Sequence, residues 1–244
     1  MRLLLLAGTH EARHIAVALS RESYLRLSVS LPAPERNPRP FGWPVRIGGW
    51  GGEEPFRRFL KREGIEAIID ATHPFARGMS HRAARVADEM GIDHVQFLRP
   101  AWMPSEGDNW IFLNSEAEAA NHIPPGKTVF LSTGRRELDA FRNIPEARLI
   151  CRIRDWTQQP FPFGNGRFLY QQGPFRVADE VALFERLGVD WVIARNSGGP
   201  GSWPKIEAAR ELGLPVAMVR RPRQPDGLKI ASVAETLAWV RRRL

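Results

Sequence analysis

Glu66-Ala67-Ile68-Ile69-Asp70-Ala71-Thr72-His73-Pro74-Phe75-Ala76 is the stretch that decides the fold. Residues 67–69 form a short apolar run, which is typical of a strand in a sheet that is covered on both faces. Apolar residues then recur at helical spacing as far as Met90, and Gly91 is placed to end a helix in the left-handed conformation. Pro74 suits the first turn of that helix, because this position needs no N–H group. The stretch therefore predicts a strand followed directly by a helix.

Three polar residues stand between this strand and this helix. Asp70, Thr72 and His73 are expected at the carboxyl end of a central strand, which is where open α/β sheets bind their ligands. The neighbouring helix N-terminus offers N–H groups to an anion. These side chains can act as acids, bases or ligand contacts, although a histidine that only completes a local hydrogen bond fits the pattern as well.

Strands and helices alternate along almost the whole chain, which predicts parallel sheets and right-handed βαβ connections. Pro124-Pro125-Gly126 is typical of a linker, and the strand–turn–helix pattern restarts after it. Residues 110–113, with a helix over 115–122, are expected to bridge the two parts. We therefore expect an α/β protein with two Rossmann-like halves, residues 1–123 and 127–244, an inter-domain cleft, and the last helix packed back on the first half.

Composition and charge exclude several classes of protein. The single cysteine, Cys151, rules out an internal disulfide framework and a multi-cysteine zinc site. The apolar run Leu3–Leu6 is too short for a signal peptide or a membrane span, so a cytoplasmic protein without membrane contact is expected. The net charge of +8 first suggests nucleic acid. The basic residues are spread out, however, and the one dense run, residues 241–243, ends a helix. A polyanionic small molecule is therefore the expected partner, and nucleic acid is not.

The first strand, Arg2–Leu6, leads into a turn at Gly8-Thr9 and then into a helix. Gly8 is the only glycine in this turn, so the dinucleotide fingerprint G-x-G-x-x-G is missing, and an ordinary tight turn fits equally well. Thr9 can cap the helix, and Glu11 lies in its first turn, where an acidic side chain is favourable.

The same segment contains a pattern of zinc proteases. His10-Glu11-Ala12-Arg13-His14 matches H-E-x-x-H, which places two imidazoles on one helix face. His10, however, falls at the very start of the helix, and the nearest third ligand, Glu35, lies in a proline-rich loop. We therefore expect no metal and keep a zinc hydrolase only as the weaker alternative.

Two loops of the second half combine backbone amides with basic side chains. The loop that begins at Asn196 can form an anion-binding nest, and a lysine lies at the start of the helix that follows it. The loop that begins at Thr133 leads into a helix that starts with two arginines. Each loop also has a purely structural interpretation. The first can be a turn whose glycines only satisfy backbone geometry, and the arginines of the second can lie on a solvated helix surface. The residues are Asn196, Ser197, Gly198, Gly199 and Lys205 in the first loop, and Thr133, Gly134, Arg135 and Arg136 in the second.

Beyond these local patterns, the chain resembles the precorrin-6A reductases, a family of NADPH-dependent enzymes of cobalamin biosynthesis. The resemblance covers nearly the whole chain in the same order, and the motifs at Asp70 and Asn196 are together specific to it. The matching segments are residues 7–13, 46–52, 70–76, 99–102, 131–138, 173–175, 196–199, 205, 212–216 and 221–222.

The resemblance implies hydride transfer from NADPH to precorrin-6A, or to its cobalt form, which gives the precorrin-6B form. Neighbouring enzymes of the corrin pathway are further expected partners. By analogy, the cofactor is expected on Gly8, Thr9, Glu11, Arg13, Thr72 and His73. The tetrapyrrole substrate is expected on Arg77 and on the residues of the two loops named above, and His73 and Lys205 are the candidates for assisting protonation.

Three departures from the family pattern and one alternative accompany this interpretation. Residues 30–36 replace a Ser-x-Ala-Gly-Arg-Thr turn, with Arg36 as a substitute for its arginine; Arg195 stands where lysine is usual, and Gln172 where arginine is usual. The altered turn bears on the preference for NADPH over NADH. A non-enzymatic binding module for an anionic metabolite would keep the same loops but would not turn over a cofactor.

Overall fold

The computed structural model describes residues 1–34 and 40–244, so Glu35 and Arg36 lie outside the described residues. The chain divides into two compact units. Unit 1 comprises Met1–Pro100 and Pro222–Leu244, and unit 2 comprises Ala101–Arg221. Each unit contains one six-stranded sheet in which all the paired strands are parallel. The predicted α/β class with two Rossmann-like sheets is therefore confirmed.

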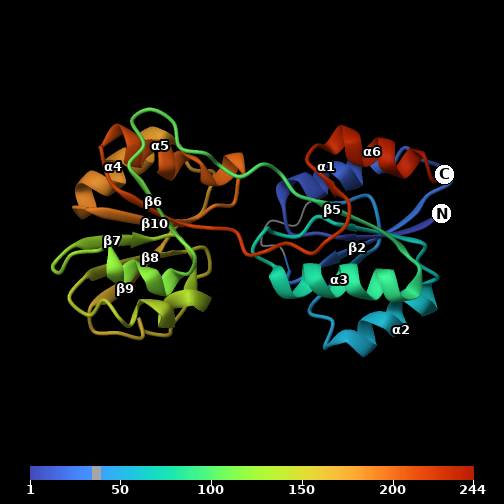
Figure 1. The fold of residues 1–244 in the computed structure, drawn as a ribbon, viewed down its shortest axis with the longest axis horizontal. Helices are drawn as coiled ribbons and strands as arrows, with labels where there is room; N and C mark the ends of the chain where they lie inside the picture. Colours follow the sequence, from blue (N-terminus) through green and yellow to red (C-terminus); the bar gives the residue numbers. More distant parts are fainter. Residues whose placement is uncertain (35–39) are drawn as a thin grey trace. The chain divides into compact units, whose positions relative to one another are not determined.

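Unit 1 has the strand order β12-β5-β4-β1-β2-β3, with β1 and β4 at its centre. Helices cover both faces, α1 and α6 on one and α2 and α3 on the other (Figure 1). The four leucines of β1 explain this layering, because Leu3 and Leu5 pack toward α1 and α6, whereas Leu4 and Leu6 pack toward α2 and α3. The elements are β1 (Arg2–Leu6), α1 (His10–Leu19), β2 (Arg26–Leu31), β3 (Val45–Ile47), α2 (Glu53–Glu63), β4 (Ala67–Asp70), α3 (Arg77–Met90), β5 (Asp93–Phe97), β12 (Lys229–Ile230) and α6 (Val233–Arg241).

Unit 2 has the strand order β6-β11-β10-β7-β8-β9. Helices α4 and α5 lie together on one face of this sheet (Figure 1), where Phe184 and Ile206 pack on Phe130 and Val192. The elements are β6 (Trp110–Leu113), η1 (Glu116–Asn121), β7 (Thr128–Leu131), η2 (Arg135–Phe141), β8 (Arg148–Ile153), β9 (Gly166–Tyr170), α4 (Val177–Leu187), β10 (Trp191–Arg195), η3 (Pro200–Ser202), α5 (Pro204–Glu211) and β11 (Val216–Val219), where η marks a 3₁₀ helix.

The division between the units differs from the predicted boundary at residues 123–127. Strand β6 pairs with β11, so it belongs to the second sheet and does not bridge the halves, and Pro124-Pro125-Gly126 lies inside unit 2. The chain returns to unit 1 at Pro222, adds β12 to the edge of the first sheet, and packs α6 against α1. Pairing between distant segments therefore sets the units, and local proline content does not.

Three helices also differ from their predicted form. Helix α3 begins at Arg77, because residues 73–76 form a separate turn in which Ala76 N donates to His73 O at 2.7 Å. Pro74 therefore lies before the helix and not in its first turn. The segments after Ser115 and Gly134 are 3₁₀ helices, η1 and η2, and not α-helices.

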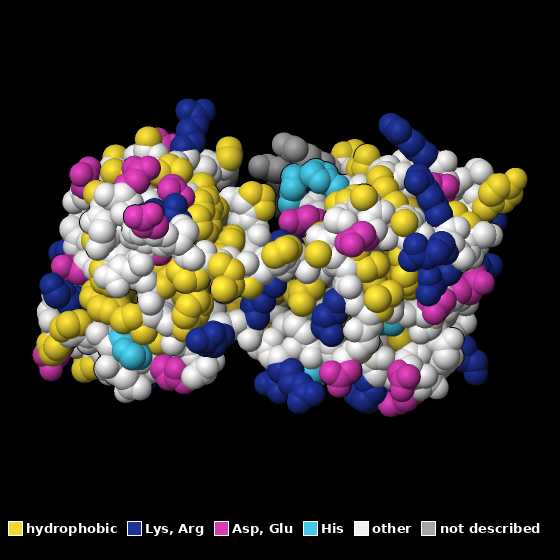
Figure 2. Space-filling view, turned by 45° about the horizontal axis from the view of Figure 1, so that its top comes forward, with side chains coloured by type: hydrophobic (Ala, Val, Ile, Leu, Met, Phe, Trp, Pro, Cys, Tyr) yellow, Lys and Arg dark blue, Asp and Glu magenta, His cyan; other side chains and the backbone are white. Residues whose placement is uncertain are grey.

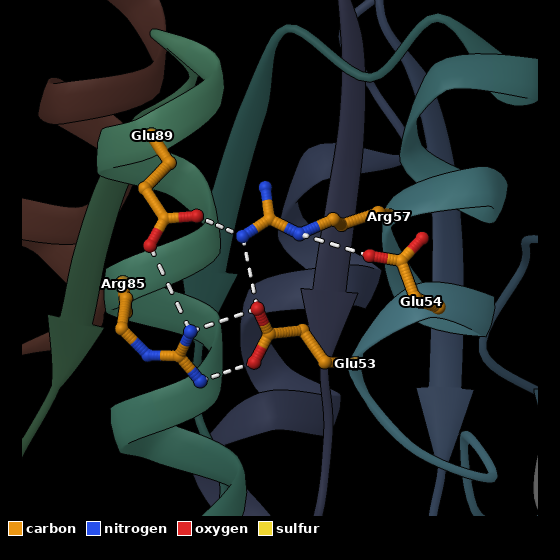
Figure 3. Close-up of polar contacts among 5 residues, drawn as sticks. All are labelled: Glu53, Glu54, Arg57, Arg85 and Glu89. Atoms are coloured by element: carbon orange, nitrogen blue, oxygen red, sulfur yellow. Dashed lines mark hydrogen bonds and ion pairs between the residues drawn. The ribbon is translucent and has the colours of Figure 1, made fainter.

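Helices α2 and α3 are joined by a network of ion pairs (Figure 3). Glu53 accepts hydrogen bonds from Arg57 and from both terminal nitrogens of Arg85, and Arg57 also contacts Glu54 and Glu89. The hydrogen bond from Arg85 is the main cause of a lowered Glu53 pKa, which falls to about 2. Glu53 is therefore ionised throughout the neutral range.

Lys and Arg side chains are scattered over the face of each unit in Figure 2, with Asp and Glu side chains among them. This arrangement agrees with the spread of basic residues along the sequence. Among the described residues, no helix is both long enough and apolar enough to cross a membrane.

Candidate functional site

The candidate site of unit 1 lies where β1 and β4 end, because Leu6 and Asp70 are paired at the ends of these adjacent parallel strands. A Cβ atom on Gly8 would lie 3.5 Å from His73 N and 3.6 Å from Thr72 Cα, so the two turns that follow the strands touch. Thr9 joins them as well. Its hydroxyl caps α1 by accepting from Ala12 N at 3.2 Å, and donates to Ala71 O at 3.0 Å.

The turn after β4 is held from within. The carboxylate of Asp70, which is fully buried, accepts from Thr72 N at 3.1 Å, and Thr72 Oγ1 lies 3.2 Å from Ser80 Oγ of α3. His73 Nδ1 accepts from Phe75 N at 3.2 Å. No side-chain hydrogen bond caps α3, and Met79 N and Ser80 N donate to Ala76 O, which leaves the N–H groups of Arg77 and Gly78 at the helix start. Uncapped helix N-termini of this kind are suited to anions.

The returning C-terminal segment also supports the turn after β4. Gln224 Nε2 donates to Pro74 O at 3.0 Å, and Gln224 Oε1 accepts from Gln96 Nε2 at 2.9 Å. On α3, His81 Nε2 lies 2.9 Å from Arg223 O. The turn carrying Thr72 and His73 is therefore fixed by residues far from it in the sequence.

Glu11, Arg13 and Arg77, three of the charged residues expected to bind ligands, occupy different surroundings. Glu11 forms a partly buried ion pair with Arg99 at 2.7 Å, so its carboxylate is committed to the protein. The Arg13 guanidinium stacks on the Phe41 ring at 4.0 Å, which orients it beside the first turn of α1. Arg77 is exposed at the start of α3.

The H-E-x-x-H pattern places two imidazoles side by side at the start of α1. His10 is the first residue of α1, and its ring packs edge-on against that of His14 at 4.2 Å. Within residues 1–34 and 40–244, no three His, Cys, Asp or Glu side chains are grouped as metal ligands would be. The proposed third ligand, Glu35, lies outside this range.

In unit 2, the candidate loop follows β10. The side chain of Asn196 is buried and bonded twice to Trp102: its Oδ1 accepts from Trp102 N at 2.8 Å, and its Nδ2 donates to Trp102 O at 2.9 Å. The backbone N–H groups of Asn196 and Ser197 donate to Val219 O and Arg195 O. The expected nest therefore retains only the amides of Gly198 and Gly199, and Gly198 has the positive φ of 71° that such a turn needs.

The loop after β7 is the second expected anion site. Thr133 is buried, and its Oγ1 has no hydrogen-bond partner among the described residues. Gly134 adopts a φ of 87° and starts η2, on which Arg135 and Arg136 are both exposed. The loop therefore presents two cationic side chains at the end of β7, next to a hydroxyl that is free to bond.

Lys205 is a buried cation of unit 2 whose pKa is strongly lowered. It is 9% exposed at the start of α5 and donates to Ser202 O at 2.5 Å. Burial, with the neighbouring positive charge of Arg152, lowers its pKa to about 7. A lysine of this kind exchanges a proton near neutral pH, which an exposed lysine does not.

Two residues near Lys205 were missed by sequence reasoning. Arg152 and Glu180 are both buried and form a paired contact, with Arg152 Nη2 2.7 Å and Nη1 2.9 Å from the two Glu180 oxygens. Arg152 also stacks on Phe130 and Phe175 at 4.7 and 4.3 Å. Its position inside the apolar run of β8 was a signal, because a charge in a buried strand needs a partner. Nothing in the helix pattern singled out Glu180.

This geometry can be set beside known proteins. Residues 2–241 match the family described as precorrin-6x reductase CbiJ/CobK. The chain belongs to that family. A precorrin-6A reductase from Rhodococcus erythropolis is 39% identical over 242 residues, covering 98% of this chain and 97% of the relative. One from Sinorhizobium sp is 37% identical over 237 residues, covering 97% and 91%.

A solved structure of CobK precorrin-6A reductase agrees with the fold of this CbiJ/CobK family member. Its TM-score is 0.91 at 33% identity, and the match covers 99% of this chain and 96% of that one. The family inferred from the sequence is thereby confirmed, together with an oxidoreductase assignment in cobalamin biosynthesis. Two departures from the family pattern have defined surroundings. Arg195 pairs with Glu116 and Glu137, and the side chain of Gln172 contacts the Tyr170 hydroxyl.

Proposed function

We propose that the chain is an NADPH-dependent precorrin-6A reductase that transfers a hydride to the macrocycle of precorrin-6A or its cobalt form, giving the precorrin-6B form. The observation that carries the proposal is the meeting of the turns after β1 and β4, at Gly8, Thr9, Thr72 and His73. Family membership supplies the reaction class. The net charge of +8 suits two polyanionic ligands.

The unit 1 turns fit a dinucleotide on chemical grounds. A side chain at Gly8 would fill the space next to His73 N, so glycine leaves room there for a phosphate group. The α3 N-terminus has no side-chain cap, and Arg13 is oriented beside α1 by Phe41. We infer that Gly8, Thr9, Arg13, Thr72 and His73 hold the cofactor, which supplies the hydride when bound.

Glu11 has a different role in this proposal from the one expected. Its pairing with Arg99 makes it a support for the start of α1, and not a cofactor contact. The enzyme's own contribution is to orient the cofactor and the macrocycle.

In unit 2, the two exposed arginines of η2 and the glycine amides of the loop after β10 suit the carboxylates of a tetrapyrrole. We assign these contacts to Arg135, Arg136, Gly198 and Gly199, with Thr133 as a hydroxyl donor. Arg77, on α3 of unit 1, remains a proposed carboxylate contact. Reduction of a double bond also consumes a proton, and we propose that Lys205 supplies it, because its pKa of about 7 lets it donate at neutral pH. His73 is the second candidate.

The test is a fluorescence titration with NADPH and NADH, followed by spectroscopic assay of precorrin-6A reduction. We expect saturable binding that favours NADPH, and Arg13→Ala should weaken NADPH binding about tenfold, as loss of one charged hydrogen bond does. Arg21→Ala, an exposed arginine just after α1, is the matched control and should leave binding unchanged.

The outcomes separate the proposed functions. Binding of both ligands without oxidation of NADPH would favour a binding module. Absence of nucleotide binding, with and without the tetrapyrrole, would refute the reductase. Stoichiometric zinc, with loss of activity on chelation and in His14→Ala, would instead favour the hydrolase.

A further inference from the structure

Two connections join the units, Pro100 to Ala101 and Arg221 to Pro222. On either side of each connection, a nearby residue is held by hydrogen bonds or an ion pair within its own unit. Arg99 and Trp102 flank the first connection, and Arg221 and Gln224 flank the second. Chain this short between two fastened residues limits how far apart they can move.

In unit 2, both connections are fastened to one residue. Trp102 exchanges two hydrogen bonds with the Asn196 side chain, at 2.8 and 2.9 Å. Arg221 Nε donates to Asn196 O at 2.8 Å, and its Nη2 donates to Ser197 O at 3.1 Å. Asn196 is 5% exposed, and its own N–H donates to Val219 O at 3.0 Å. Asn196 therefore holds both connections at the end of β10.

In unit 1, the same connections are fastened to the two turns proposed to hold the cofactor. Arg99 pairs with Glu11 at 2.7 Å, in the first turn of α1. Gln224 donates to Pro74 O at 3.0 Å, immediately after His73. Each connection thus links a cofactor turn of unit 1 with Asn196 of unit 2.

We propose that Asn196 is a positioning residue that couples ligand binding in the two units, and that it is not a substrate contact. The inference rests on the proposed function, since it takes the cofactor on unit 1 and the tetrapyrrole on unit 2. A ligand that moves the loop after β10 moves Trp102 and Arg221, and through them the anchors at Glu11 and Pro74. Both polar atoms of the Asn196 side-chain amide are bonded to Trp102, so this amide holds the first connection in place.

The test measures the affinity of NADP⁺ with and without saturating precorrin-6A, a pair of ligands that does not turn over. In the wild type, we expect precorrin-6A to change the NADP⁺ Kd by about fivefold or more, the usual size of coupling between sites. Asn196→Ala removes both bonds to Trp102 and keeps the backbone oxygen that accepts from Arg221, so it releases the first connection and should bring this ratio toward one. Gln224→Ala should do the same from the unit 1 side, where it leaves the fold of unit 2 untouched.

Asn165→Ala is the matched control. Asn165 also binds backbone in unit 2, donating to Ala147 O at 2.8 Å and Ile144 O at 3.2 Å, but it touches neither connection. It should keep the wild-type ratio. A wild-type ratio in Asn196→Ala or Gln224→Ala would overturn the inference, as would a ratio of one in a wild type that binds both ligands. A wild type that binds neither ligand would instead refute the proposed function, and the inference with it.

Discussion

Among single residues, Lys205 carries the clearest consequence for stability. Burial lowers its pKa from 10.5 to about 7 in the folded protein, so between these values the unfolded chain binds more protons. The free energy of unfolding should therefore rise with pH across this range, whereas below about pH 7 the full cost of burying the charge is present. At 1.36 kcal/mol per pKa unit, that cost is roughly 5 kcal/mol at most.

Lys205→Met removes this cost. We expect the variant to be more stable than the wild type at about pH 6, and its advantage to shrink as the pH approaches about 10. Urea unfolding of both proteins across this range measures the difference, with the exposed Lys229→Met as control. A difference that does not change with pH would contradict the assignment.

The sequence gives residue types and spacing, and these led to Thr9, His73 and Lys205. It does not give partners that lie far apart in the chain. The prediction that the Asn196 loop binds a ligand did not include the bonds between the Asn196 side chain and Trp102, and the partner of Arg152 lies on another element. Both assignments depend on tertiary contacts, which no local pattern contains.

At the level of elements, α1 depends on one hydroxyl. Thr9 caps this helix and also holds the turn after β4 through Ala71 O. Thr9→Ala should lower the free energy of unfolding by about 1–3 kcal/mol, from the lost cap and hydrogen bond together. It should also weaken NADPH binding, because the two turns separate. Thr9→Ser should retain both properties.

Ser232→Ala provides the control for this prediction. Ser232 forms a capping box with Glu235 at α6, which lies in the same unit but away from both turns. It should lower stability in urea unfolding by about 1 kcal/mol without changing the Kd for NADPH. Equal losses of binding in the two variants would show that Thr9 acts only through stability.

The α2–α3 network of Figure 3 has a defined pH dependence. Glu53 has its pKa lowered to about 2, chiefly by the hydrogen bond from Arg85, so its contribution to stability is present above the unfolded pKa of 4.5. The contribution is lost as the pH falls toward 2. Glu53→Gln should therefore have a lower urea midpoint of unfolding than the wild type near neutral pH, and the difference between the two midpoints should disappear in acid. High salt should reduce this difference too, since these side chains are partly exposed.

Most elements could be predicted from the sequence because their signals are local. Short continuous apolar runs predicted the strands, and Gly91 ends α3 with a positive φ as expected, as Gly64 and Gly188 do for α2 and α4. Strand β12 was missed, because two residues carry no periodicity, and its pairing with β5 depends on the returning chain. The late start of α3 follows from the turn at His73, which propensity does not encode.

At the scale of the whole molecule, the fold class followed from strand–helix alternation, but the division into units did not. Which sheet takes β6, and which takes residues 222–244, depends on pairing between segments that are distant in sequence. The chain of unit 1 is interrupted by all of unit 2, and a linear reading assigns boundaries only between consecutive segments. The proline-rich linker candidate marked a surface turn of unit 2 instead.

Unit 1 is expected to need residues 222–244 in order to fold alone. Residues 222–244 place Ile230, Trp239 and Val240 in the core of unit 1, with Trp239 only 1% exposed. Removing one such tryptophan costs about 3–5 kcal/mol, and whole domains are stable by only about 5–15 kcal/mol. A protein made of residues 1–100 alone should therefore lack a cooperative unfolding transition.

A permuted chain should restore that transition. Arg241 pairs with Glu22 at 2.8 Å, and the Met1 amino group donates to Tyr24 O at 3.1 Å, so both termini lie near residues 22–24. Residues 222–244, followed by a short glycine-rich linker and residues 1–100, should fold with a cooperative urea transition. This protein should also bind NADPH, because Gly8, Thr9, Thr72 and His73 all belong to unit 1. Folding without nucleotide binding would place part of the cofactor site on unit 2, and cooperative unfolding of residues 1–100 alone would refute the structural role of the returning segment.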